Sequence, residues 1–279
     1  MFEQVKRDPI AGGPLGASDD RFCFMNNFIR FPLLILVASF FVMLLSAWIG
    51  IRFRRRRSKI DDDVRQDLDL IITAVLTLLA LIIGFSFLMA VSRYDQRKNY
   101  EEAEANAIGT EYVRADLLPA ADGARVRTLL RDYLDQRVLF YQTRDQRELQ
   151  QTNTRTAQLQ TELWYAVDAL PPAQRTPVAA LAVSGMNDVL NSRGYTQAAW
   201  WNRIPVGAWL LMAAVAICSN LLVGYGMRST ESGIVRLVVL PLVLCIAFFL
   251  IADIDSPRRG IIFVQPQNLI SLAQSLHYH

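Results

Sequence analysis

The sequence predicts an all-α integral membrane protein with four transmembrane helices and a helical extramembrane domain between the second and the third. Three observations predict this fold: four long runs without a charged residue, a polar segment between the second and third runs, and a helical apolar period inside that segment. Of the 279 residues, 52% are apolar and 20% are charged, and the formal net charge is +3. This composition excludes a disordered chain and is too apolar for an ordinary soluble globule.

The lengths of the uncharged runs decide which of them can cross a bilayer, because a spanning helix needs about 20 residues. The first three runs have 21, 23 and 24 residues and are long enough. The fourth, from Leu237 to Ala252, has 16 residues and gives about 24 Å of helix, so Arg236 or Asp253 must reach into the interfacial zone. Pro241 removes one backbone hydrogen bond from this helix and predicts a kink. We therefore expect spans at residues 31–51, 70–92, 204–227 and 234–254.

The segments between the spans are polar, and the basic residues among them bear on topology. They are an N-terminal tail (1–30), a short basic loop (52–69), the extramembrane domain (93–203), a short loop (228–233) and a C-terminal tail (255–279). Seven Lys or Arg residues in the first loop favour a cytoplasmic position for it, which places the extramembrane domain outside the cytoplasm. Ten basic residues flank the membrane on the other side, so the orientation stays open. The arginine run is either a topology determinant or a site for anionic lipid headgroups.

The extramembrane domain is predicted to be helical throughout. It holds 14 basic and 14 acidic residues, and the second span is expected to continue as one long helix to Pro119. Asp122 is expected to cap the next helix, and Gly194 to mark a linker after a helix that ends near Leu190. Trp200 and Trp201 suit the membrane interface. Apolar residues on that next helix follow a spacing of three and four, which gives it one apolar face: Val126, Leu129, Leu130, Tyr133, Leu134, Val138 and Tyr141.

The chain lacks the residues and motifs of common enzyme chemistry. Its two histidines, His277 and His279, lie at the C-terminus, and no nucleotide-binding, serine-hydrolase, structural-zinc or metalloprotease motif is present. We therefore expect no enzyme, no catalytic residue, no cofactor and no nucleic-acid partner. No charged residue lies near the middle of any span, which disfavours a proton pump or an ion-coupled transporter. Asn220 is the most polar side chain within them and is expected to bond a neighbouring helix.

Carboxylates close to the membrane have two interpretations. They could form a cation site or charged vestibule, or they could pair with nearby arginines and fix the domain on the membrane. Whether a metal binds is left open. The carboxylates are Glu101, Glu102, Glu104, Glu111, Asp253 and Asp255, and the arginines are Arg93, Arg97, Arg114, Arg258 and Arg259.

The end of the second span is the candidate gate. Gly84 permits close packing, and Phe85 and Phe87 could point into an axis shared by several copies of the chain. A ring of such side chains would be a hydrophobic constriction that conducts when it is wetted. In a single copy the same residues would be ordinary packing.

The stretch from Leu78 to Pro119 and the segment DIDSPRRG from Asp253 to Gly260 resemble the bestrophin-like family of four-span membrane proteins. A remoter similarity links Gly84, Phe85 and the RYDQR run to the pattern of true bestrophins. That run supplies the candidate junction residues Arg93, Tyr94, Asp95 and Arg97. The positions that match the motifs of the bestrophin-like family are Glu104, Asn106, Gly109, Thr110, Asp253, Asp255, Pro257 and Gly260.

The resemblance implies an architecture and a function. True bestrophins are pentameric, chloride-selective channels whose second span lines the pore, so Phe85 and Phe87 would correspond to the neck. The acidic run that bestrophins use for calcium is matched only by Asp253 and Asp255, and bestrophins keep the large domain in the cytoplasm. We therefore expect a homo-oligomer in the lipid bilayer of the inner (plasma) membrane that passes inorganic anions. The alternative is a non-conducting scaffold that binds partners through its helical domain, with an exposed apolar stripe at Leu129, Leu130, Tyr133 and Leu134.

Overall fold

The computed structural model describes residues 32–55, 62–168, 176–227, 233–258 and 260–277, and within these ranges it is helical with no strand. Outside the described residues lie the N-terminal tail, residues 56–61 of the basic loop, residues 228–232 of the short loop, Pro171, Pro172, Arg259 and His279. The helices are α2 (Pro32–Arg55), α3 (Asp62–Arg114), the short η1 (Ala115–Leu117), α4 (Ala120–Gln142), α5 (Gln146–Asp168), α6 (Ala179–Trp201), α7 (Val206–Gly226), α8 (Gly233–Asp255) and α9 (Gln267–His277).

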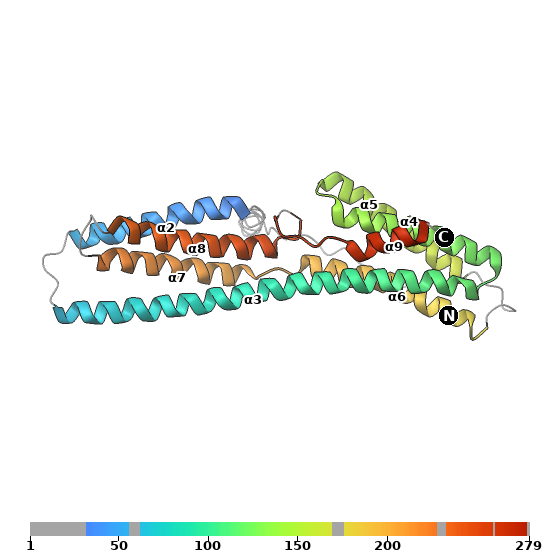
Figure 1. Cartoon of the computed structure of the whole chain (residues 1–279), viewed down its shortest axis with the longest axis horizontal. Coiled ribbons are helices and arrows are strands. Elements are labelled where there is room, and N and C mark those ends of the chain that lie inside the picture. Colours follow the sequence, from blue (N-terminus) through green and yellow to red (C-terminus); the bar gives the residue numbers. More distant parts are fainter. Residues whose placement is uncertain (1–31, 56–61, 169–175, 228–232, 259, 278–279) are drawn as a thin grey trace, which may run out of the picture.

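The helices form two bundles placed end to end (Figure 1). One bundle contains α2, α7, α8 and the N-terminal half of α3, and the other contains α4, α5, α6, α9 and the C-terminal half of α3. Four helices are long and apolar enough to cross a membrane, and all four contribute to the first bundle. Each bundle has its own apolar core, and Tyr94 on α3 packs against both cores. The four-span, all-α prediction is confirmed.

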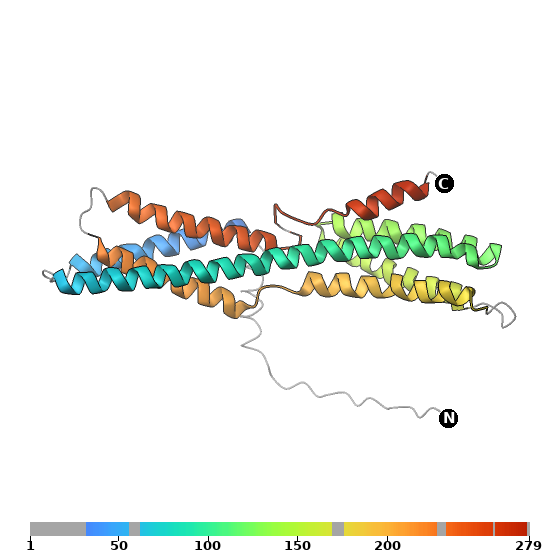
Figure 2. The same ribbon diagram turned by 60° about the horizontal axis from the view of Figure 1, so that its bottom comes forward.

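Helix α3 connects the two bundles as a single element of 53 residues, about 80 Å long. Figure 2 shows that α3 continues without a break beside the connection between α6 and α7 and beside the end of α8. The prediction that the second span continues beyond the membrane as one helix is confirmed. Gly109 does not interrupt the helix, and a Cβ there would lie 3.1 Å from the side chain of Leu272 on α9.

Glycines bring α2 and α7 into close contact inside the membrane bundle. A Cβ at Gly224 of α7 would lie 2.1 Å from the carbonyl oxygen of Ala47, and a Cβ at Gly50 of α2 would lie 2.2 Å from that of Leu221. Small residues let helix backbones approach where lipid supplies no hydrophobic driving force. The Ser46 hydroxyl also donates to the carbonyl oxygen of Ile217 at 2.7 Å.

Three local predictions are wrong, and one helix was not predicted. Asn220 on α7 donates to the carbonyl oxygen of Ala216 on its own helix at 2.8 Å and not to a neighbouring helix. Helix α4 begins at Ala120, directly after Pro119, so Asp122 lies inside its first turn and is not the cap; Pro119 fixes the backbone just ahead of the helix. Helix α6 runs through Gly194 to Trp201 without a linker, because one glycine costs a helix only about 1 kcal/mol. The C-terminal tail contains α9, whose apolar side packs on α3 and α4.

Candidate pore face and the junction of the two bundles

Helix α3 is exposed over much of its surface, and one exposed face runs along both bundles. Exposed side chains recur on it at alternating intervals of three and four residues, which keeps them on one side of a helix. We call this face the α3 seam, and its residues are Leu78, Leu81, Phe85, Leu88, Ser92, Asp95, Asn99 and Glu102. The seam is apolar through Leu88 and polar from Ser92 onward, where the helix leaves the predicted span.

The structure separates the three candidate gate residues. Phe85 lies on the α3 seam with 60% of its surface exposed, and a Cβ at the neighbouring Gly84 would meet no atom within 4 Å. Phe87 is also exposed, but it lies two residues further and therefore on the other side of the helix. Ser86 between them is buried. The α3 seam thus carries Phe85 and not Phe87.

The candidate junction residues lie where the two bundles meet. Arg97 is buried and donates to three carbonyl oxygens: that of Ala199 at 3.4 Å, that of Ile254 at 3.1 Å and that of Asp255 at 3.2 Å. These carbonyls belong to the last turns of α6 and α8, where the backbone has no further helical partner. One arginine on α3 therefore joins the C-terminal ends of two other helices.

The Asp255 carboxylate completes this junction. It accepts the backbone N–H of Ile204 at 3.2 Å and lies 3.6 Å from Arg93. Asp253, two residues earlier, accepts the N–H groups of Ile261 at 2.7 Å and Ile262 at 2.8 Å. A Cβ at Gly260 would lie 2.4 Å from the carbonyl oxygen of Asp253, so this turn requires glycine. The DIDSPRRG motif therefore forms the C-terminal end of α8 and the turn that follows it.

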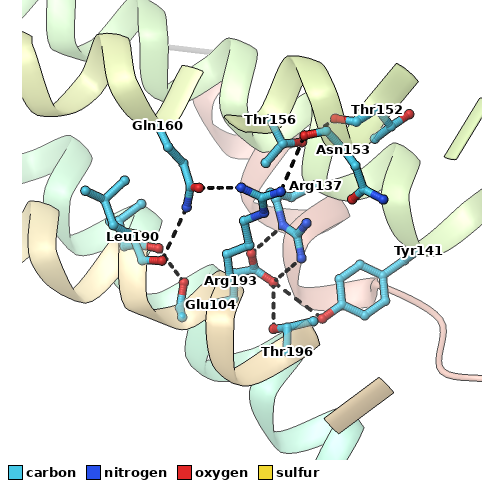
Figure 3. Close-up of polar contacts among 12 residues, drawn as sticks. Glu104, Arg137, Tyr141, Thr152, Asn153, Thr156, Gln160, Leu190, Arg193 and Thr196 are labelled. Atoms are coloured by element: carbon cyan, nitrogen blue, oxygen red, sulfur yellow. Dashed lines mark hydrogen bonds and ion pairs between the residues drawn. The ribbon is translucent and has the colours of Figure 1, made fainter. Parts of the chain in front are cut away.

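Glu104 is the centre of a buried polar cluster in the extramembrane bundle (Figure 3). Its Oε1 accepts a hydrogen bond from Nε of Arg137 at 2.5 Å, and its Oε2 accepts one from Nη2 of Arg137 at 3.2 Å. The two residues therefore form a bidentate ion pair. Thr196 at 3.2 Å and Tyr141 at 3.4 Å also donate to Oε2. The cluster joins α3, α4 and α6. Burial alone lowers the pKa of Arg137, but the Glu104 carboxylate outweighs burial and raises it.

The other carboxylates after the second span have separate environments. Glu101 accepts the N–H of Leu269 at 3.0 Å and the side-chain amide of Asn268 at 2.7 Å, and so caps the N-terminus of α9. Glu102 is exposed on the α3 seam. Glu111 is fully buried, and neither of its oxygens has a hydrogen-bond partner among the described residues.

The structure therefore does not gather the candidate carboxylates into one site. Among the described residues no group of three His, Cys, Asp or Glu side chains could hold a metal ion. Of the remaining motif positions, Asn106 and Thr110 are exposed on α3, and Pro257 is buried in the turn after α8.

Sequence reasoning missed Arg137, the partner of Glu104. A signal for it exists: Arg137 continues the three-and-four spacing of the apolar face of α4 after Tyr133 and Leu134. A charged residue on an otherwise apolar stripe indicates a buried ion pair. Helix α9 also had a signal, because Leu269, Leu272, Ala273 and Leu276 follow the same three-and-four spacing. Its N-terminal cap, Glu101, comes from a distant part of the chain and had none.

The architecture defines a class: helical membrane proteins in which a four-span bundle and a helical extramembrane bundle share one long central helix. The model of the bestrophin-like domain matches residues 35–269, so the chain belongs to the bestrophin-like family. No curated protein matches the chain in sequence.

Solved structures show the same fold. A bacterial bestrophin homologue from Klebsiella pneumoniae superposes with a TM-score of 0.61 at 14% identity, over 86% of this chain and 96% of that chain. A point variant of this homologue gives 0.63 at 12% identity, over 86% and 97%. A second variant gives 0.61 at 13% identity, over the same shares.

Proposed function

We propose that this protein is an oligomeric, anion-permeable channel of the plasma membrane in which the α3 seam of each copy faces a central axis. The observation that carries the proposal is the seam itself, an unbroken exposed face that passes from the membrane bundle into the extramembrane bundle. The other three spans of the same chain leave this face open. A long face of regular period is suited to pack or line an axis between copies.

Phe85 is the proposed constriction. It is the bulkiest side chain on the apolar part of the α3 seam, and a ring of phenylalanines would exclude water from the axis when closed. Gly84, which has open space around it, would let neighbouring helices approach at this level. Bestrophins are known as channels and not as enzymes, and the family membership supports a channel here.

The scaffold alternative was expected to show an exposed apolar stripe on α4, and three of the four residues of that stripe are buried. Leu130 and Tyr133 have no exposed surface, and Leu134 is 1% exposed, because they belong to the core of the extramembrane bundle. Leu129 is half-buried against the same core. The prediction of an exposed apolar stripe at these residues is wrong, and no partner site can be built on it.

Anion flux through liposomes tests the proposal. Purified protein should pass anions, and Phe85→Ala should raise the flux several-fold because it widens the hydrophobic constriction. Phe41→Ala is the matched control, since Phe41 on α2 is 65% exposed but does not lie on the α3 seam. Equal flux from both variants, or none from folded and oligomeric wild type, would favour the scaffold.

The same assay tests the sign of the permeant ion. Asp95 and Glu102 place two carboxylates of each copy on the polar part of the α3 seam. Carboxylates at the axis repel anions, so Glu102→Gln should raise anion flux. A fall in anion flux, with cation flux through the wild type, would contradict anion permeation.

A further inference from the structure

A polar cavity lies where α7 and α8 meet the extramembrane bundle. It has a volume of about 220 Å³ and is lined from several helices and from the turn after α8. Its polar lining consists of Arg203, Arg258, Gln146, Asn153, Gln197 and Ser256. The described residues that line this cavity include two arginines and no carboxylate. The charge of the nearby Asp255 acts on Arg203, so the excess positive charge of the lining lies on Arg258.

Arg258 is held firmly in the wall of the cavity. Its guanidinium lies 4.3 Å from the ring centre of Trp200 and 4.5 Å from that of Phe140. It donates to the carbonyl oxygens of Phe140 at 2.7 Å and Thr143 at 3.1 Å. Rings and carbonyls thus fix the orientation of the charge without neutralising it.

Arg258 takes part in no ion pair among the residues that the structure describes. Burial lowers its pKa to about 10, and the nearby charge of Arg137 acts in the same direction. Burying a guanidinium without a carboxylate partner costs free energy, and a bound anion would offset that cost.

The indole of Trp200 supplies a further unmatched donor. Trp200 is 6% exposed, and its Nε1 has no acceptor among the described residues. Tryptophan N–H groups usually find an acceptor when they are buried. A ligand that brings several acceptor oxygens and negative charge would satisfy both the guanidinium and the other donors of the lining.

The place of the cavity indicates where such a ligand comes from. Trp201, the last residue of α6, lines the cavity and has 73% of its surface exposed, and α7 enters the membrane bundle at Val206. Tryptophan at this level is typical of the lipid headgroup zone. A water molecule takes about 30 Å³ in the liquid, so the cavity has room for a phosphate group with a few attached atoms.

We infer that this cavity binds a phosphate group, held by Arg258, that belongs either to an anionic lipid headgroup or to free phosphate. Guanidinium groups match the geometry of phosphate oxygens and form strong charge-assisted hydrogen bonds with them. The site is distinct from the α3 seam, and its occupancy can be measured without any assay of ion flux.

Thermal unfolding of the full chain in detergent tests the inference. The probes are short-chain phosphatidylglycerol and sodium phosphate, compared with short-chain phosphatidylcholine and sodium chloride at equal ionic strength. Stabilisation by phosphatidylglycerol alone assigns a headgroup, and stabilisation by both anions assigns the phosphate group itself. Either result supports the site if it depends on the cavity.

The variant Gln197→Glu tests whether binding depends on the cavity. It places a negative charge in the lining and keeps the contacts of Arg258. It should weaken binding at least about tenfold. Gln150→Glu, the same change at an exposed position of α5, is the control and should leave binding unchanged. Arg258→Gln is a second variant with the expected loss, and the unliganded unfolding temperature of each variant verifies its fold. The inference is overturned if neither anion stabilises the wild type more than its control, or if Gln197→Glu and Gln150→Glu behave alike.

Discussion

At the scale of single residues, buried charge holds the extramembrane bundle together at Glu104. This carboxylate and Arg137 are each almost completely buried, and Tyr141 and Thr196 on two neighbouring helices also donate hydrogen bonds to Glu104. Removing one partner of such a pair leaves a charge without compensation in the interior, which is more costly than removing both.

Glu104→Gln is therefore expected to destabilise the fold by about 3–5 kcal/mol. Thermal unfolding in detergent measures the loss, with Asp135→Asn, an exposed position on α4, as the matched control. The double variant with Arg137→Met should lose less than Glu104→Gln alone. A Glu104→Gln protein as stable as the Asp135→Asn control would show that the ion pair is not a structural centre.

Glu111 gives a residue-scale prediction of pH dependence. It lies on the part of α3 beyond the predicted span, and burial raises its pKa from 4.5 to about 8, while Arg114 opposes the shift. Between these two pKa values the unfolded chain loses the proton and the folded chain keeps it. The stability of the folded state therefore falls as the pH rises from about 5 to 8.

Glu111→Gln should remove this dependence, because glutamine carries no proton to lose. Relative to the wild type, the variant should gain roughly 1–2 kcal/mol in stability between pH 5 and pH 8. Unfolding temperatures across this range measure the gain, and Asp132→Asn on the exposed side of α4 should run parallel to the wild type. Parallel curves for Glu111→Gln and the wild type would contradict the account.

At the scale of elements, the contact of α2 with α7 depends on backbone approach. Gly224→Ala would drive a methyl group into the carbonyl of Ala47, so the two helices would have to separate. We expect a loss of about 1–3 kcal/mol in the stability of the membrane bundle, measured by thermal unfolding in detergent. Gly207→Ala on the same helix is the control, because a Cβ there meets nothing within 4 Å. Equal loss from both variants would contradict close packing at Gly224.

The same scale shows what the sequence could predict. The lengths of the apolar runs were sufficient to predict the four spans. The three-and-four spacing of apolar residues was sufficient to predict the buried face of α4. The start of α4, the continuation of α6 through Gly194 and the existence of α9 were missed although local signals existed. Pro119 directly precedes α4, a single glycine does not end a helix, and the apolar residues of α9 are spaced by three and four. The partners of Glu101 and Glu104 lie on other helices, so local patterns in the sequence could not identify them.

At the scale of the whole molecule, one uncovered helical face crosses both bundles. Arg97 and Glu104 bind α3 to its neighbouring helices through their hydrogen bonds on the buried side of α3. The α3 seam therefore remains available to other copies of the chain. In the proposed channel, the α3 seams of the copies meet at one axis.

Cysteine cross-linking in native membranes tests this claim most directly. In a background without Cys23, Cys218 and Cys245, Phe85→Cys and Phe41→Cys place single thiols at two exposed membrane positions of similar accessibility. We expect mild oxidation to join Phe85→Cys chains into covalent dimers and to leave Phe41→Cys chains single. Dimers from Phe41→Cys alone, or none from Phe85→Cys, would contradict a central α3 seam.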